Sequence, residues 1–151
     1  MGSQSQILLE QTLIFTESDD QQHRKILLEL KKGYQELHID FSYSPQDVPE
    51  EQALRSIAAM LPKYDQKNNL QANDFLPLKN LITLSLAYEE AYLGCRHNKE
   101  TEQNIMISET ASSLGFIPQS VQPGNWEIQL NLHCVQSTVT VNIAVKGVTN
   151  K

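Results

Sequence analysis

Histidines and cysteines are the residues of this sequence that could bind a metal or carry redox chemistry. The sequence contains four histidines, at His23, His38, His97 and His133. None of them follows the H-x-H or H-E-x-x-H spacing that brings two imidazoles onto one metal ion. The two cysteines, Cys95 and Cys134, lack a C-x-x-C spacing and are too few for a disulfide framework. We therefore expect no bound metal, no cofactor, and two buried free thiols in a reducing, cytoplasmic setting.

The segment Gly94-Cys95-Arg96-His97-Asn98 is the main candidate for a ligand site. Glycine allows tight backbone geometry, and adjacent arginine and histidine side chains can bind an anion together. Tyr92 precedes this segment and could add a ring surface for stacking. The alternative is that Arg96 and His97 are polar residues at the end of a strand. We expect the other three histidines to be solvated.

The residues that enzymes use in common catalytic motifs are absent or badly spaced. There is no G-x-S-x-G elbow and no glycine-rich phosphate loop. Acidic residues occur in adjacent pairs such as Glu89-Glu90, and neighbouring residues of a strand point to opposite faces. Trp126 could stack on a sugar, but its position in an apolar alternation predicts that it packs in the core. We therefore expect that the protein is not an enzyme.

Composition excludes several classes of partner. The chain has 151 residues and a formal net charge of −6, which disfavours nucleic acid and anionic membrane surfaces. Hydrophobic residues make up 40% of the sequence, as in a globular domain. No apolar run approaches the ~18 residues of a membrane span, and the start lacks the pattern of a signal peptide. We expect one soluble domain over residues 1–151.

Alternation of apolar and polar residues is the dominant pattern. It is clearest at Trp126 to Cys134 and at Thr138 to Val145, which we interpret as a hairpin with a turn near Gln136. We expect further strands at Ile7 to Phe15, Ile26 to Leu30, Leu37 to Tyr43, Leu81 to Tyr88, Tyr92 to His97 and Asn104 to Ser108. About eight short strands predict an all-β, antiparallel two-sheet sandwich of jelly-roll type.

One segment has helical periodicity instead. From Pro49 to Leu61 the apolar residues recur at the spacing of an amphipathic helix. Pro49 suits the first turn, and we expect Pro62 to end the helix. Such an inserted helix, near residues 49–61, could cap an open end of the sandwich or cover a sheet edge.

The second half of the chain resembles a known family. The Gly94 turn and the segment Pro123-Gly124-Asn125-Trp126 carry most of this resemblance, and Leu37 to Pro45 adds to it. These segments are similar to the β-rich N-terminal domain that precedes the catalytic barrel of CehA-like PHP metal-dependent phosphoesterases. In that family the metal-binding histidines belong to the following domain, which opens with a His-x-His motif. This chain has no His-x-His, and it has Gln119 where such domains often repeat a glycine.

The resemblance implies a non-catalytic accessory or interaction domain. Its partner would be a PHP-type phosphoesterase domain, in the same polypeptide or on a separate chain, or another protein. A homo-oligomer is also possible. The alternative function is that of a small-ligand module that binds a carbohydrate or an anion through Arg96, His97 and Tyr92. A large exposed apolar patch would favour the first hypothesis, and a concave polar pocket on which Arg96 and His97 converge would favour the second.

Overall fold

Eight strands and one α-helix make up most of the chain. A computed structural model describes residues 3–64, 76–96 and 100–150. The helices are a short 3-10 helix, η1 (Glu17–Asp19), and α1 (Glu50–Tyr64). The strands are β1 (Ser3–Phe15), β2 (His23–Leu30), β3 (Glu36–Ser44), β4 (Leu81–Tyr88), β5 (Ala91–Arg96), β6 (Glu102–Ser108), β7 (Gly124–Cys134) and β8 (Val139–Asn150).

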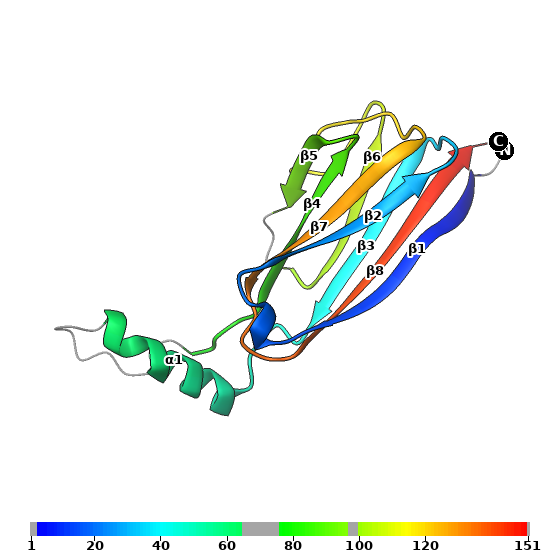
Figure 1. The fold of residues 1–151 in the computed structure, drawn as a ribbon. Coiled ribbons are helices and arrows are strands. Elements are labelled where there is room, and N and C mark those ends of the chain that lie inside the picture. The colour runs from blue at the N-terminus through cyan, green and yellow to red at the C-terminus, as the bar shows by residue number, and fades with distance from the viewer. Residues whose placement is uncertain (1–2, 65–75, 97–99, 151) are drawn as a thin grey trace.

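The strands form two stacked antiparallel sheets (Figure 1). Sheet A has the order β1-β8-β3-β6, and sheet B has the order β2-β7-β4-β5. The first strand therefore pairs with the last, the second with the seventh, the third with the sixth, and the fourth with the fifth. This nested pairing, divided between two sheets, is that of an eight-stranded jelly roll. The expected all-β sandwich is confirmed.

The connection between β7 and β8 corrects one expectation. These strands lie in different sheets, so the expected hairpin near Gln136 is wrong. Residues 135–138 instead cross from sheet B to sheet A. Asn80, itself buried, holds the crossing, because its amide accepts from the Gln136 N–H at 2.9 Å and donates to the Ser137 hydroxyl at 2.9 Å. Ser137 is therefore buried and hydrogen-bonded, and the backbone of half-buried Gln136 is fixed, so the segment is an anchored crossing rather than a hairpin turn.

The core lies between the sheets and contains the predicted alternating residues. Trp126 is fully buried on β7, with its indole N–H donating to the Gln122 carbonyl at 3.1 Å. Its ring centre lies 4.5 Å from that of Tyr88 on β4. The predicted core role of Trp126 is confirmed. The inward residues of the two best-patterned strands are Ile128, Leu130 and Leu132 on β7, and Val139, Val141, Ile143 and Val145 on β8.

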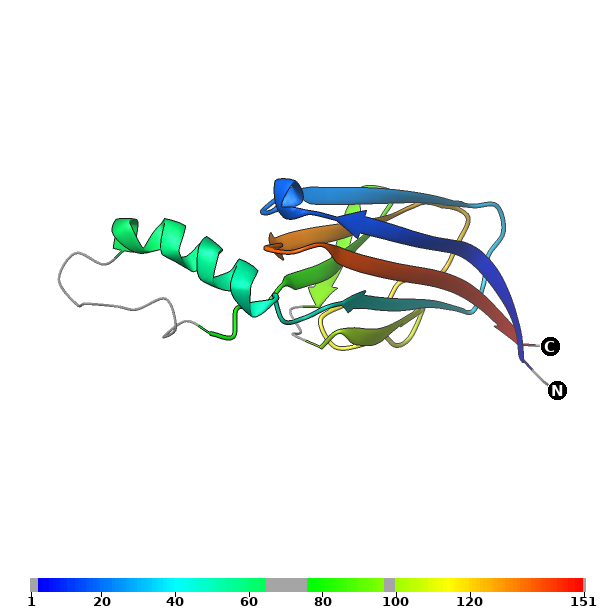
Figure 2. The same cartoon turned by 90° about the horizontal axis from the view of Figure 1, so that it is seen from below.

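The helix is longer than predicted, and it lies at one end of the sandwich, which was one of the two expected places. It runs to Tyr64, so Pro62 does not end it. Pro62 lacks the N–H that would bond to the Ala58 carbonyl, so the last turn loses one helical hydrogen bond, and the helical backbone continues for two further residues. The helix projects from one end of the sandwich and covers no sheet edge (Figure 2). A hydrogen bond between Gln52 and Glu17 ties its first turns to η1. Within the described residues, no helix is long and apolar enough to cross a membrane.

The edges of both sheets at β5 and β6 are covered by the loop of residues 109–123. Its backbone bonds to β5 through the Cys95 N–H and the Gly115 carbonyl at 3.2 Å, and to β6 through the Ser113 N–H and the Met106 carbonyl at 2.9 Å. The approach at β5 needs glycine, because Gly94 has a φ of +138° and a Cβ there would lie 2.1 Å from the Gly115 oxygen. The tight backbone geometry predicted at Gly94 is confirmed.

Loss of the Trp126 side chain tests the core. We expect Trp126→Ala to lower the free energy of unfolding by about 3 to 5 kcal/mol, because a large buried aromatic leaves a cavity. Leu27→Ala is the matched control, since Leu27 is exposed on neighbouring strand β2 and its loss should change stability little. Chemical denaturation measures both. Equal stability of the two variants would contradict the assignment of Trp126 to the core.

The buried phenol of Tyr43 predicts a loss of stability at alkaline pH. Burial raises the pKa of Tyr43 above its usual value of about 10. The unfolded chain then releases this proton at a lower pH than the folded protein does. The folded state therefore keeps its full stability below about pH 10 and loses free energy of unfolding as the pH rises above that value. Tyr43→Phe should therefore lose less stability between pH 9 and pH 11 than the parent, in thermal melts over that range. Identical pH profiles would exclude this contribution.

Candidate functional site

The predicted anion site is not assembled as a pocket by its described residues. The Arg96 guanidinium donates to the Asn104 carbonyl of β6 at 3.1 Å, so it ties β5 to the neighbouring sheet. Tyr92 lies on β5 with 64% of its surface exposed. Burial of its hydroxyl and the nearby Cys95 thiol raise the Tyr92 pKa. His97 lies outside the described residues. The contact of Arg96 with the Asn104 carbonyl thus favours the alternative in which Arg96 is a polar residue at the end of a strand.

A connected set of polar side chains lies on the outer face of sheet B. Asn131 on β7 is its centre, and it is nearly fully buried although it points away from the core. Its amide N–H groups donate to the Ser85 hydroxyl at 2.7 Å and to the Thr83 hydroxyl at 3.3 Å, both on β4. Its amide oxygen contacts the His23 imidazole at 2.9 Å. This network links β2, β7 and β4 through side chains as well as through the backbone.

Two further groups extend the network at its ends. The Cys95 thiol lies 3.8 Å from the Thr83 hydroxyl, and the His133 imidazole lies 2.8 Å from that same hydroxyl. Both cysteines are free thiols and only half-buried, less than the sequence suggested. Because these groups bond to one another, the outer face of sheet B is a satisfied polar layer rather than an open ligand site.

The outer face of sheet A carries a groove of about 720 Å³. Two parallel rows of side chains cross the four strands and line it. One row is Glu10, Ala144, Asp40 and Asn104, and the other is Thr12, Asn142, Ser42 and Glu102, each in the order β1, β8, β3 and β6. Neighbouring strands lie about 4.8 Å apart, so Glu10 and Asp40 stand about 10 Å apart on either side of the small side chain of Ala144.

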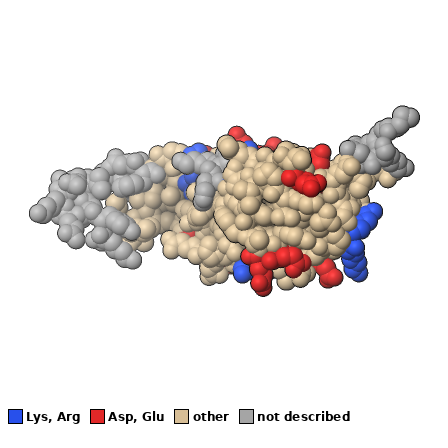
Figure 3. Space-filling model, turned by 90° about the horizontal axis from the view of Figure 1, so that it is seen from above, with Lys and Arg blue, Asp and Glu red and all other residues tan. Residues whose placement is uncertain are grey.

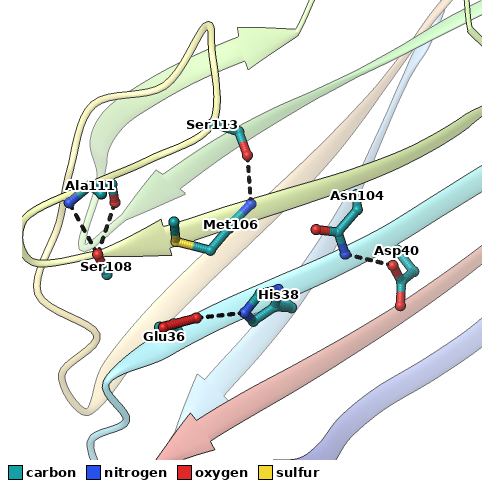
Figure 4. Close-up of polar contacts among 8 residues, drawn as sticks. All are labelled: Glu36, His38, Asp40, Asn104, Met106, Ser108, Ala111 and Ser113. Carbon is teal, nitrogen blue, oxygen red and sulfur yellow. Dashed lines mark hydrogen bonds and ion pairs between the residues drawn. The ribbon is translucent and has the colours of Figure 1, made fainter.

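Hydrogen bonds within each row orient the polar groups. The Asn104 amide donates to the Asp40 carboxylate at 2.7 Å, as Figure 4 shows between β6 and β3. The Thr12 hydroxyl donates to the Asn142 amide oxygen at 2.8 Å. Further along β3 and outside the groove lining, the His38 imidazole contacts the Glu36 carboxylate at 2.8 Å (Figure 4). The groove therefore presents prearranged hydrogen-bonding groups beside its carboxylates.

The charge of the groove has one sign. Among the described residues, its lining includes the three carboxylates of Glu10, Asp40 and Glu102 and no lysine, arginine or histidine. Acidic side chains also occupy more of the surface than basic ones in the view of Figure 3. Among the described residues, no group of three His, Cys, Asp or Glu side chains could hold a metal ion. The groove is thus suited to a cationic or hydroxyl-rich ligand and unsuited to an anion.

Sequence reasoning missed the groove, although it found the strands that build it. Asp40 and Ser42 were visible as the polar face of one strand, and Thr140 and Asn142 as that of another. Nothing local indicated that β3 and β8 are neighbours, because residues 100 positions apart meet in this sheet. The available signal was that polar residues of several strands must share one outer face.

Comparison with known proteins adds little to this geometry. No protein-family model and no curated protein matches the sequence. One solved structure with similarity is that of dimeric latent PorU from Porphyromonas gingivalis, at 10% sequence identity and a TM-score of 0.37. The alignment covers 97% of this chain and 14% of that chain, so this chain spans a small part of its length.

The contact of Arg96 predicts that small anions do not stabilise the protein. Since its guanidinium already bonds to the Asn104 carbonyl, phosphate and sulfate should leave the melting temperature of the parent unchanged at constant ionic strength. Arg96→Ala should lower the melting temperature equally with and without these anions. A shift of several degrees that is absent in Arg96→Ala, and larger at lower pH, would restore the anion site.

Proposed function

We propose that the protein is a non-catalytic interaction domain whose groove on sheet A receives a cationic segment of a partner protein. The observation that carries this proposal is the lining of that groove, in which Glu10, Asp40 and Glu102 face the same hollow and none of the other described lining residues is basic. A lysine or arginine side chain over Ala144 would have Glu10 on one side and Asp40 on the other. The exposed amides and hydroxyls of the two rows would bond to the backbone of the bound segment.

Magnitudes favour a segment with several charges over a single ion. One exposed ion pair contributes about 0.2 to 1 kcal/mol, which is too little to hold a partner. Three carboxylates contacted together, with hydrogen bonds around them, supply enough for weak and reversible binding. The net charge of −6 would also accelerate the encounter with a basic partner. Both effects should weaken as salt screens the charges.

The second candidate function is the binding of a neutral carbohydrate in the same groove. Carboxylates, amides and hydroxyls are suitable partners for sugar hydroxyl groups. No exposed aromatic ring is among the described residues that line this groove, since Phe41 is buried in the core below it. Without a ring to stack on, sugar binding loses its main apolar contribution. This difference ranks the carbohydrate below the cationic segment.

Association with a PHP-type metallo-phosphoesterase is a further part of the proposal. Its support is the resemblance at the Gly94 turn and at Pro123-Gly124-Asn125-Trp126. In the structure Gly94 allows the close approach of the 109–123 loop, and Trp126 fills the core. These residues have structural roles, which supports a sandwich similar to that of the family, and neither of them contacts a partner in this proposal. We place the protein in the reducing cytoplasm, where two unpaired cysteines are typical.

Titration with defined probes tests the cationic ligand. Tetralysine added to the isotopically labelled protein should shift the NMR signals of the residues that line the groove. The triple variant Glu10→Gln, Asp40→Asn, Glu102→Gln should lose these shifts, because the shape is kept and the charge is removed. Glu109→Gln is the matched control, since Glu109 is an exposed acid outside this groove. Higher salt should weaken binding to the parent.

Neutral oligosaccharides of glucose and xylose form the second arm of the same experiment. Shifts at the groove with these sugars, and none with tetralysine, would favour the carbohydrate function. Tetralysine binding that survives in the triple variant would move the proposed site elsewhere. The absence of groove shifts with both probes would overturn the proposal that this face is a binding surface.

A further inference from the structure

The edge strands on the two sides of the sandwich differ in whether another segment covers them. On one side the 109–123 loop bonds to the backbones of β5 and β6, as described above. On the other side β1 is the outermost strand of sheet A, and it pairs only with β8 within the described part of the chain (Figure 1). A long, uncovered edge strand presents a row of free backbone donors and acceptors to another chain.

The composition of β1 does not protect this edge. The strand has 13 residues with a single charge, Glu10, and it has no lysine, arginine or proline. Its outward side chains Ile7 and Ile14 are 56% and 65% exposed. Leu9 and Leu13 face the core but are only partly buried. A strand laid beside β1 would cover these leucines and satisfy its edge.

We propose that the occupant of this edge is a second copy of the chain, paired antiparallel through β1 about a twofold axis at Gln11. In this register Leu9 lies opposite Leu13 of the second copy, Glu10 opposite Thr12, and Gln11 opposite Gln11. On the core side the two Leu9–Leu13 pairs flank the Gln11 pair, and on the outer face Glu10 meets Thr12. The pairing uses residues 9–13, beyond the irregularity at Ile7/Leu9.

Neighbouring registers are less favourable for physical reasons. An axis at Glu10 would place two carboxylates directly opposite each other, which is destabilising. An axis at Thr12 would place Glu10 against Ile14 and Gln11 against Leu13. An axis at Leu9 would place Gln11 against Ile7. Of these registers, only the axis at Gln11 places apolar residues opposite apolar ones and polar residues opposite polar ones without facing carboxylates, so β1 is self-complementary there.

The same pairing joins two grooves. Glu10, Gln11 and Thr12 form the β1 end of the groove lining. In the dimer each row of sheet A would continue onto the partner, with Thr12 of the second copy next to Glu10. The combined sheet would have eight strands and one acidic groove across it. Dimerisation stands independently of what the groove binds.

Sedimentation and light scattering of the full chain test the proposal. The parent should be a concentration-dependent dimer, as expected for a short strand pairing. Gln11→Lys should shift it to monomer, because two ammonium groups would meet at the axis. Gln4→Lys is the matched control, since it adds the same charge to the same strand outside residues 9–13, and it should stay dimeric. Circular dichroism checks that both variants are folded.

Cross-linking tests the register. Opposite residues of an antiparallel pair have Cα atoms about 4.5 or 5.5 Å apart, within the range for a disulfide. Gln11→Cys should therefore give a covalent dimer on oxidation, and neither the parent nor Gln4→Cys should. A covalent dimer from Thr12→Cys instead would overturn the register at Gln11. A parent that is monomeric at all concentrations, or a dimer insensitive to Gln11→Lys, would overturn the interface.

Discussion

The rest of this structure depends on one constraint, which is that every strand has one apolar face that must be removed from water. Alternation places Trp126, Ile128 and Leu130 on one side of β7 and polar residues on the other. A single sheet with such a face is unstable alone, so a second sheet must cover it. The nested pairing of the strands meets this requirement, because it distributes consecutive pairs between two sheets.

Once the inner faces are buried together, the two outer faces are free to differ. On sheet B the side chains around Asn131 satisfy one another, and burial makes these bonds expensive to break. On sheet A the corresponding positions hold exposed carboxylates around a small alanine, Ala144. Side chains that already bond to one another leave few groups for a ligand. Neighbouring carboxylates in a groove, in contrast, are stabilised by a bound cation. The functional proposal follows from this contrast.

The edges repeat the contrast between satisfied and open groups. The 109–123 loop bonds to β5 and β6, and the glycines at 94 and 115 permit its close approach. Edge strand β1 has no such cover within the described residues. This strand carries one charge, and its order of polar and apolar residues is the same in both directions from Gln11. Covered edges and an uncovered, self-complementary edge in one domain are the physical reason to expect association at β1.

The sequence by itself determined the local part of this architecture. All eight strands, the helix near residues 49–61 and the core position of Trp126 were predictable, because each depends on periodicity within a few residues. The predicted end of the helix was wrong, because the helical backbone continues through Pro62 to Tyr64 although this proline removes one helical hydrogen bond.

Only the tertiary structure decided which strands are neighbours. Because β7 and β8 are in different sheets, there is no hairpin at Gln136. The same strand order places Arg96 beside the Asn104 carbonyl, and it brings Glu10, Asp40 and Glu102 from three strands to one groove. Strand order depends on pairings between residues far apart in the sequence, such as β1 with β8, and their free energy comes from burying both sheets together rather than from any local pattern.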